Sequence, residues 1–197
     1  MSNIEIIQQR IKDSVEVKEK ILREESLLNT ISRLADEIVD CLHKGGKLIL
    51  CGNGGSASDA LHFASEIVGR FERERRSWPA IVLNTNGSTM TAIANDYGYD
   101  DIFARQIDGL LKNEDLFICI STSGNSENVY RALLRSKEIG ARTACLTGYD
   151  GGKVGKTADI SIVIPSYVTA RIQECHINII HILCEIVETK LSKSEAS

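Results

Sequence analysis

The stretch CGNGGSASDALHFASE, residues 51–66, combines two kinds of chemistry. Its first half is rich in glycine and serine, which is typical of a turn that holds an anion with backbone N–H groups. Its second half places His62 and Glu66 four residues apart, so that the two side chains share one face of a helix. A helix that begins near Ser56 would keep both within about three turns of the anion-binding end. The stretch therefore predicts a phosphate cradle next to an acid/base pair.

A second polar set interrupts the apolar segment RIQECHINIIHILCEI, residues 171–186. A histidine such as His181 among isoleucines is unfavourable unless it is hydrogen-bonded or functional. Each polar residue alone is more often a satisfied core or interface residue. Spacing does not choose between His176 and His181, because both lie within roughly a quarter turn of Gln173 around the helix.

Two loops have the composition of a phosphate site. In the first, NGGSASD (53–59), Ser56 and Asp59 resemble a capping box. The second, STSGNSEN (121–128), offers several hydroxyls around one glycine, and Ser126 is placed to cap the next helix. Each loop also suits an ordinary turn, but two of them at equivalent strand ends favour ligand binding. Neither matches the glycine-rich nucleotide motifs, so nucleotide binding is disfavoured.

Five short apolar runs predict the strands that position these loops: 47–52, 80–84, 116–121, 142–147 and 160–165. Helix-like segments lie between most of them, at 57–69, 88–110 and 127–139. Strands that alternate with helices predict an α/β fold, a doubly wound five-stranded parallel sheet in a single domain over 1–197. The link 148–159 is too short and too rich in glycine to promise a full crossover helix.

Helical periodicity also marks both ends of the chain, over about 1–44 and 168–191. These helices carry more apolar surface than one sheet edge needs. They either cover the sheet or join subunits, and the sequence does not choose between the two. The tail 192–197 is predicted to fray.

Composition excludes several classes of function. Hydrophobic residues make up 43% and charged residues 25%, as in ordinary soluble proteins, and the net charge of −4 gives no general attraction to nucleic acid or anionic lipid. No membrane span or secretory signal is expected, and six cysteines without a CxxC pair indicate buried reduced thiols and a cytoplasmic location. In RFERERR (70–76), two glutamates interrupt four arginines, which favours a solvated face, with a local pocket role for one arginine as the alternative.

Together these features suggest proton transfer on a phosphorylated small molecule. Interconversion of an aldose and a ketose needs a base that moves a proton between adjacent carbons, and an acid or a metal at the enediol oxygen. Two histidines, a carboxylate and an amide oxygen could equally hold Zn²⁺. The residues alone therefore favour a phosphosugar site with isomerisation as its chemistry.

At these residues the sequence resembles a known family. CGNGGSASDALHFASE, AIANDYGYDDIF, ISTSGNS, LTGYDGG and RIQECHINIIHILCEIVE follow in the order of the signatures of the phosphoheptose isomerases, over about residues 40–190. Those enzymes belong to the sugar isomerase (SIS) superfamily, with a flavodoxin-like fold. The resemblance implies conversion of sedoheptulose 7-phosphate to D-glycero-D-manno-heptose 7-phosphate, the first step toward the ADP- or GDP-heptose of bacterial surface glycans.

The resemblance also implies roles for individual residues. Glu66 would be the base and His181, rather than His176, the acid. The substrate would contact Asn53, Gly54, Gly55, Glu66, Asn95, Asp96, Ser121, Thr122, Ser123, Ser126 and Gln173. One Zn²⁺ per subunit would be bound by His62, Glu66, Gln173 and His181. Family members form homotetramers with active sites between subunits, which would give the helices of residues 1–44 a role in assembly.

Two non-catalytic classes share this domain. Bacterial replication-initiator-associating proteins use it as a tetrameric adaptor, and RFERERRSWPAIVLNTNGSTMTAIAND resembles their sequences as much as those of the isomerases. They lack the acid/base set that His62, Glu66, Gln173 and His181 would form here. Phosphosugar-sensing regulators carry a further DNA-binding module, for which 197 residues leave no room. The sequence therefore predicts the enzyme, with the adaptor as the alternative.

Overall fold

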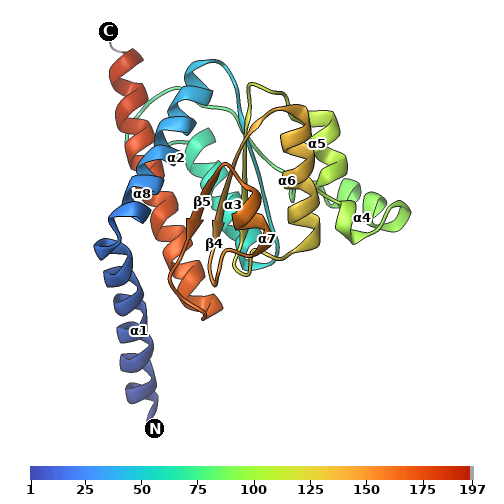
Figure 1. Ribbon diagram of the computed structural model, residues 1–197. Coiled ribbons are helices and arrows are strands. Elements are labelled where there is room, and N and C mark those ends of the chain that lie inside the picture. Colours follow the sequence, from blue (N-terminus) through green and yellow to red (C-terminus); the bar gives the residue numbers. More distant parts are fainter. Residues whose placement is uncertain (196–197) are drawn as a thin grey trace.

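The five apolar runs form the strands of one parallel sheet in the computed structural model, which describes residues 1–195 and side chains up to Ser192 (Figure 1). The strands are β1 Leu48–Gly52, β2 Ala80–Val82, β3 Leu116–Ser121, β4 Arg142–Thr147 and β5 Ile160–Val163. Their order in the sheet is β2-β1-β3-β4-β5. The predicted doubly wound five-stranded sheet is therefore confirmed, although β2 is shorter than the run that predicted it.

The helices are α1 Asn3–Arg23, α2 Glu25–His43, α3 Gly55–Val68, α4 Gly87–Asp96, α5 Ala104–Leu110, α6 Glu127–Ile139, α7 Gly152–Thr157 and α8 Thr169–Glu195, with a 3₁₀ turn η1 at Tyr99–Asp101. Leu48 and Leu50 of β1 face a core shared with α2, α3 and α8, whereas Ile49 and Cys51 face a core shared with α5 and α6. Figure 1 shows these two groups of helices on opposite sides of the sheet. Because both faces are covered, β1 and β3 are buried along their whole length, which explains their continuous apolar sequences.

The predicted helix 88–110 is wrong as a single element, because the structure divides it into α4, η1 and α5. The Asn86 side chain caps α4 by accepting a hydrogen bond from Thr89 N at 3.0 Å. Gly98 then takes a φ of 99°, which ends the helical path and turns the chain into η1. The link 148–159 holds only the short α7, in agreement with its sequence.

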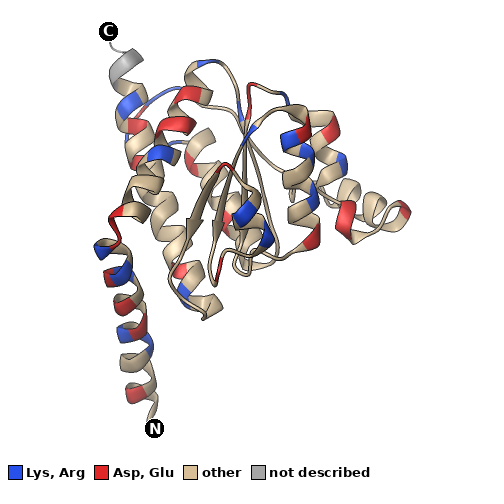
Figure 2. Ribbon diagram, viewed as in Figure 1, with Lys and Arg blue, Asp and Glu red and all other residues tan. Residues whose placement is uncertain are grey.

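The N-terminal helix α1 protrudes from the body of the molecule (Figure 1). A capping box starts it, because Ser2 Oγ accepts a hydrogen bond from Glu5 N and the Glu5 carboxylate accepts one from Ser2 N. Charged residues of both signs follow one another along the α1 ribbon (Figure 2), yet Ile4, Ile7 and Ile11 are exposed on this helix. The predicted fraying of 192–197 falls partly outside the described residues, within which α8 extends to Glu195.

Cysteines lie in neighbouring positions on the three central strands. Cys51 pairs with Cys119 across β1 and β3, and Cys119 pairs with Cys145 across β3 and β4. All six cysteines of the chain are free and buried, as predicted. Burial raises the pKa of the Cys145 thiol to about 11, so this thiol is inert at neutral pH. No helix within residues 1–195 is long and apolar enough to cross a membrane.

Candidate functional site

The two predicted loops lie next to each other at the carboxyl edge of the sheet. The connection after β1 runs through α3 to the edge strand β2, whereas the connection after β3 runs through α6 on the opposite face to β4. The strand order therefore reverses between β1 and β3. Doubly wound sheets bind ligands at such a switch point.

The loop after β3 gathers hydroxyl groups around the start of α6. Ser121 is buried, and its Oγ lies 3.2 Å from Ser126 Oγ. Ser123 Oγ accepts a hydrogen bond from Asn125 N at 3.2 Å, and Thr122 is half-buried beside it. Ser126 occupies the predicted cap position, but its side chain makes no hydrogen bond to the first turn of α6. The hydroxyls and the first N–H groups of α6 could therefore bind a phosphate.

Gly124 shapes this loop through a close approach to the loop after β4. Its φ is 64°, and a Cβ at this position would collide with the carbonyl oxygen of Gly151. Val154 N donates to Gly124 O at 2.9 Å, and Lys153 N donates to Asn125 Oδ1 at 3.2 Å. The LTGYDGG motif therefore supports the shape of the serine loop.

A reciprocal amide pair joins the two loops across the switch point. Asn53 Nδ2 donates to Asn128 Oδ1 at 2.9 Å, and Asn128 Nδ2 donates to Asn53 Oδ1 at 3.0 Å. Tyr99 Oη adds a third hydrogen bond, to Asn53 Oδ1 at 3.2 Å. Asn128 is fully buried, so its amide has no water to replace Asn53. The pair fixes the distance between the predicted sugar loop and the predicted phosphate loop.

Replacing Asn128 by Leu is expected to weaken binding of the sugar phosphate that the resemblance implies by roughly tenfold or more, because Asn53 loses two hydrogen bonds worth about 1 kcal/mol each. Isothermal titration calorimetry measures this effect. Ser136→Ala is the matched control, since Ser136 is buried in the same helix and donates only to Ala132 O. Equal affinities of the two variants would contradict a role for the amide pair in binding.

The loop after β1 differs in detail from its prediction. Helix α3 begins at Gly55 with Gly54 as its N-cap residue, and no side chain caps it. The capping box of Ser56 and Asp59 is therefore wrong: the helix starts earlier, so Ser56 lies inside the first turn, where it is buried. The amide end of the Gln173 side chain packs against Gly55, so a Cβ there would require this side chain to move. Gly54 and Gly55 themselves are exposed at the switch point.

The acid/base residues meet between α3 and α8, which lie side by side. His62 Nε2 is 3.0 Å from Glu66 Oε1 and 3.3 Å from His181 Nε2. The Phe71 ring lies against His181, with 5.8 Å between ring centroids. His62 is exposed and Glu66 half-buried, so a ligand can reach this cluster. Of the two histidines that spacing left open, His181 joins the cluster and His176 does not.

His176 has a structural role instead. It is fully buried, and its Nε2 donates to Thr147 O at 3.0 Å, whereas Nδ1 has no hydrogen-bond partner among the described residues. Burial lowers the pKa of His176 to about 4, against which the hydrogen bond to Thr147 acts only partly. The histidine is thus neutral in the folded protein.

This burial predicts a loss of stability in acid. Below the unfolded pKa of about 6.5 the unfolded chain takes up a proton at His176, and the folded chain does not do so until the pH approaches 4. The free energy of unfolding should therefore fall by up to about 3 kcal/mol as the pH falls from 7 to 4. Urea titrations at fixed protein concentration would measure the decrease. His176→Gln, which keeps a donor for Thr147 O, should flatten it, and an unchanged slope would contradict the assignment.

Three predicted site residues stand apart from the cluster. Gln173 lies about 12 Å before His181 along α8, by helix rise. Asn95 and Asp96 are exposed at the end of α4, where Asn95 Nδ2 donates to Asp96 Oδ1 at 2.8 Å. Helix α4 lies on the far side of the molecule from α8 (Figure 1).

The two halves of the predicted site are also separated within one chain. Glu66 lies eleven residues after Gly55, roughly 16 Å along α3. One chain therefore brings His62, Glu66 and His181 together, and separately brings the two switch-point loops together.

The chemistry of the cluster fits zinc in part. Imidazole nitrogens and carboxylate oxygens are zinc ligands, and two ligands of a tetrahedral zinc lie roughly 3.3 Å apart. The distances from His62 Nε2 to Glu66 Oε1 and His181 Nε2, 3.0 and 3.3 Å, match that value. Within the described part of the chain, however, no group of three or more His, Cys, Asp or Glu side chains is arranged as a metal site. A single chain therefore supplies suitable zinc ligands but does not form a complete metal site.

Sequence reasoning missed Asn128, Tyr99 and Arg75. Asn128 stands in STSGNSEN, but its partner Asn53 is 75 residues away, so only the strand order reveals the pair. For RFERERR the sequence favoured a solvated face, with a local pocket role for one arginine as the alternative, and the side chain of Arg75 is only 2% exposed. Because glutamates alternate with the arginines in this segment, the sequence does not distinguish the buried arginine from the exposed ones.

Comparisons with known proteins show which family the chain belongs to. Residues 11–148 match the family model of the SIS domain. A phosphoheptose isomerase from Geobacter sulfurreducens is 49% identical over 188 residues, which cover 95% of this chain and 98% of that protein. One from Sulfurimonas denitrificans is 47% identical over 185 residues, with 94% and 95% covered.

Solved structures give the same result. The structure of a phosphoheptose isomerase from Francisella tularensis superposes with a TM-score of 0.92 at 36% identity, covering 96% of this chain and all of that one. These likenesses do not favour the adaptor alternative. By sequence and by structure, the chain belongs to the phosphoheptose isomerases of the SIS-domain family.

Proposed function

We propose that this protein isomerises sedoheptulose 7-phosphate to D-glycero-D-manno-heptose 7-phosphate in the cytoplasm, for the heptose of bacterial surface glycans. The observation that carries the proposal is the cluster of His62, Glu66 and His181 in a fold whose switch point presents a serine loop for phosphate. The names of the similar proteins support the substrate class.

In the proposed reaction Glu66 removes the C1 proton of the ketose and returns it to C2. His181 moves the proton between the oxygens of C1 and C2, which keeps the enediol neutral. His62 Nε2 donates to Glu66 and orients its carboxylate, and the same nitrogen lies beside His181 Nε2. Ser121, Thr122, Ser123 and Ser126 bind the phosphate, and Asn53, Gly54, Gly55, Asn95, Asp96 and Gln173 line the sugar.

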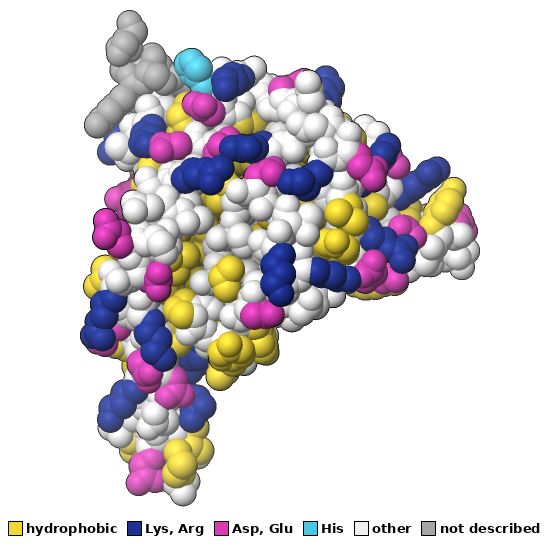
Figure 3. Space-filling view, in the orientation of Figure 1, with side chains coloured by type: hydrophobic (Ala, Val, Ile, Leu, Met, Phe, Trp, Pro, Cys, Tyr) yellow, Lys and Arg dark blue, Asp and Glu magenta, His cyan; other side chains and the backbone are white. Residues whose placement is uncertain are grey.

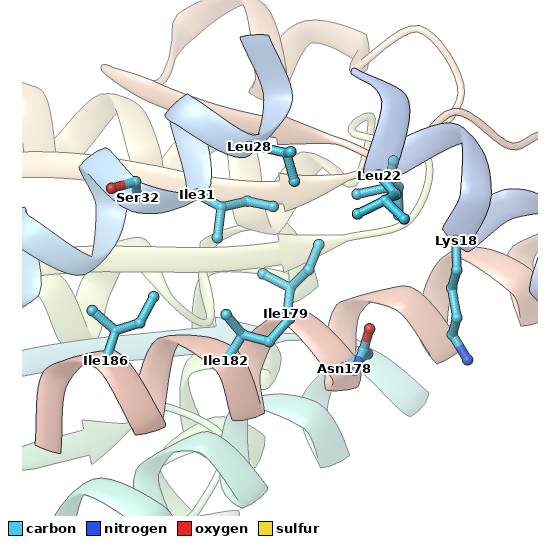
Figure 4. Close-up of a pocket in the computed structure, with 10 residues that line it drawn as sticks. Lys18, Leu22, Leu28, Ile31, Ser32, Asn178, Ile179, Ile182 and Ile186 are labelled. Atoms are coloured by element: carbon cyan, nitrogen blue, oxygen red, sulfur yellow. The ribbon is translucent and has the colours of Figure 1, made fainter. Parts of the chain in front are cut away.

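We also propose a homotetramer in which the cluster of one subunit faces the loops of another. The separation of the two halves within one chain supports this arrangement, and so do the exposed isoleucines of α1. An apolar groove lies between α1, α2 and α8, where Leu28 and Ile31 face Ile179 and Ile182 (Figure 4). Hydrophobic side chains are visible where the protruding helix joins the body (Figure 3). A helix of a second copy fits this surface.

Subunit complementation tests the shared site. Glu66→Gln and Ser123→Ala chains, each of low activity alone, would be co-expressed with different tags and purified as hybrids. If Glu66 and Ser123 of one site come from different subunits, about a quarter of the sites in a random hybrid are intact, and activity returns. If both come from one chain, the hybrid stays as inactive as its parents, and the shared site is refuted.

Zinc is proposed at His62, Glu66 and His181. Gln173 would be the fourth ligand, and because Gln173 of the same chain is too far away, it would have to come from another subunit of the assembled protein. When bound, zinc would supply a Lewis acid at the enediol oxygens. A carboxylate bound tightly to zinc is a poorer base, so zinc content and turnover of the same samples show whether Glu66 can be both ligand and base. Metal analysis of purified protein should find about one zinc per subunit. His62→Ala should lose it, and a native protein without zinc would contradict the site.

Proton NMR of the purified protein with sedoheptulose 7-phosphate in D₂O tests the reaction itself. An aldoheptose anomeric signal is expected, together with deuterium incorporated at the reacting carbon. No turnover with or without added Zn²⁺ would refute the isomerase and favour a ligand-binding adaptor.

A further inference from the structure

A buried ion pair lies behind the acid/base cluster. Arg75 Nε donates to Glu188 Oε1 at 3.1 Å, and both side chains are only 2% exposed. Arg75 belongs to the segment 69–79 between α3 and β2, and Glu188 lies on α8 two turns after His181. Proton transfer uses neither residue.

Arg75 caps the end of the helix that carries Glu66. Its Nη2 donates to Glu66 O at 2.7 Å, and its Nη1 donates to Ile67 O at 3.0 Å. The last carbonyl groups of a helix lack partners within the helix, so a buried guanidinium there fixes the final turn. The Trp78 ring holds the guanidinium from one side, 3.7 Å from its centroid. The main chain of Glu66 is therefore tied to Arg75.

Glu188 fixes the segment that contacts His181. Its carboxylate accepts hydrogen bonds from the backbone N–H groups of Phe71, Glu72 and Arg73 at 3.1, 2.8 and 2.8 Å. Burial alone would raise the pKa of Glu188, but these N–H groups and Arg75 outweigh it and lower the pKa, so the carboxylate stays ionised. Held in this way, the Phe71 ring packs against His181.

Stability alone gives no reason for this arrangement, because well-packed apolar side chains often stabilise a core as much as a buried ion pair does. The hydrogen bonds of the pair lead to the two residues of the proposed proton transfer, Glu66 through its main chain and His181 through Phe71. We propose that Arg75 and Glu188 are positioning residues of the reaction site, which hold Glu66 and His181 at their working separation. This inference rests on the proposed roles of those two residues.

The chain offers a matched control for the ion pair at the amino ends of the strands. Asp115 is also buried, and it accepts hydrogen bonds from Lys47 N at 3.0 Å, Lys112 N at 2.8 Å and Lys47 Nζ at 2.6 Å. It thus combines one cation with backbone N–H groups, as Glu188 does. Its residues precede β1 and β3, far from the carboxyl edge.

Glu188→Gln and Asp115→Asn would be compared with the native protein. Both should lower the melting temperature. Glu188→Gln alone should lower kcat by roughly 10²-fold, since a shift of about 1 Å in a reacting group has that effect, with KM changed less than about twofold. An equal loss of kcat in Asp115→Asn, or an unchanged kcat in a folded Glu188→Gln, would overturn the proposal.

A second variant and a second signal make the test independent of folding and of turnover. Phe71→Leu leaves the ion pair in place and should lower kcat without a comparable loss of stability. In ¹⁵N-histidine NMR spectra, the His181 ring signals should move in Glu188→Gln and Phe71→Leu but stay in place in Asp115→Asn. If the native protein lacks turnover, the proposed function fails, and these ring signals still decide whether the pair positions His181.

Discussion

Replacing Glu66 by Gln is expected to lower kcat for sedoheptulose 7-phosphate by about 10³-fold, the usual contribution of a positioned general base. Glutamine has the shape of glutamate and can keep the contact with His62, so the fold and substrate binding should change little. Deuterium uptake from D₂O into the substrate should fall by the same factor, because the proton-transfer step itself is lost. NMR measures turnover and exchange in one sample.

The control is Glu138→Gln on the exposed end of α6, where Glu138 pairs only with Arg135. It should keep native turnover. Metal content would be determined in parallel, so that loss of zinc is separated from loss of the base. A Glu66→Gln protein that retains more than about a tenth of native kcat would exclude Glu66 as the base.

Replacing Gly124 by Ala is expected to raise the KM by about 10²-fold or more and to destabilise the protein. The φ of 64° alone disfavours alanine by about 1–2 kcal/mol. The collision with Gly151 O adds a typical overpacking penalty of about 1–3 kcal/mol and displaces the serine loop, which is the proposed phosphate site. Urea unfolding and steady-state kinetics measure the two effects.

Gly140→Ala is the control that separates the effect of backbone strain from the effect of the collision with Gly151 O. Gly140 ends α6 with a φ of 89°, but a Cβ there would meet no atom within 4 Å. This variant should lose only the conformational part of the stability, about 1–2 kcal/mol, and keep a native KM. If both variants showed the same KM, the loop at Gly124 would not be the phosphate site.

The sheet could be predicted from the sequence because buried parallel strands leave continuous apolar runs of β-branched residues. The division of residues 88–110 into three elements could not be predicted, because η1 and α5 continue the helical pattern. Only the observed φ of Gly98 shows the break. The start of α3 was missed for a related reason. The glycines before Ser56 are typical of a loop, yet Gly55 already belongs to the helix.

The loops of the site could be predicted from their local composition, whereas the contacts between distant segments could not. Asn53 meets Asn128 only because β1 and β3 are neighbours at the switch point. Glu188 meets Arg75 across 113 residues because α8 packs along α3. Such contacts depend on strand order and helix direction, which a single sequence carries only weakly. The choice of His181 over His176 likewise needed the packed helix, or a family resemblance.

The cysteines in the central strands have a consequence for the chemical durability of the protein. Cys51, Cys119 and Cys145 lie where no reagent can reach them while β1, β3 and β4 remain paired. Alkylating or oxidising agents can modify them only after the sheet separates, so such modification reports global opening rather than local loop motion. Alkylating agents would therefore spare the folded protein at these thiols and modify the unfolded chain irreversibly.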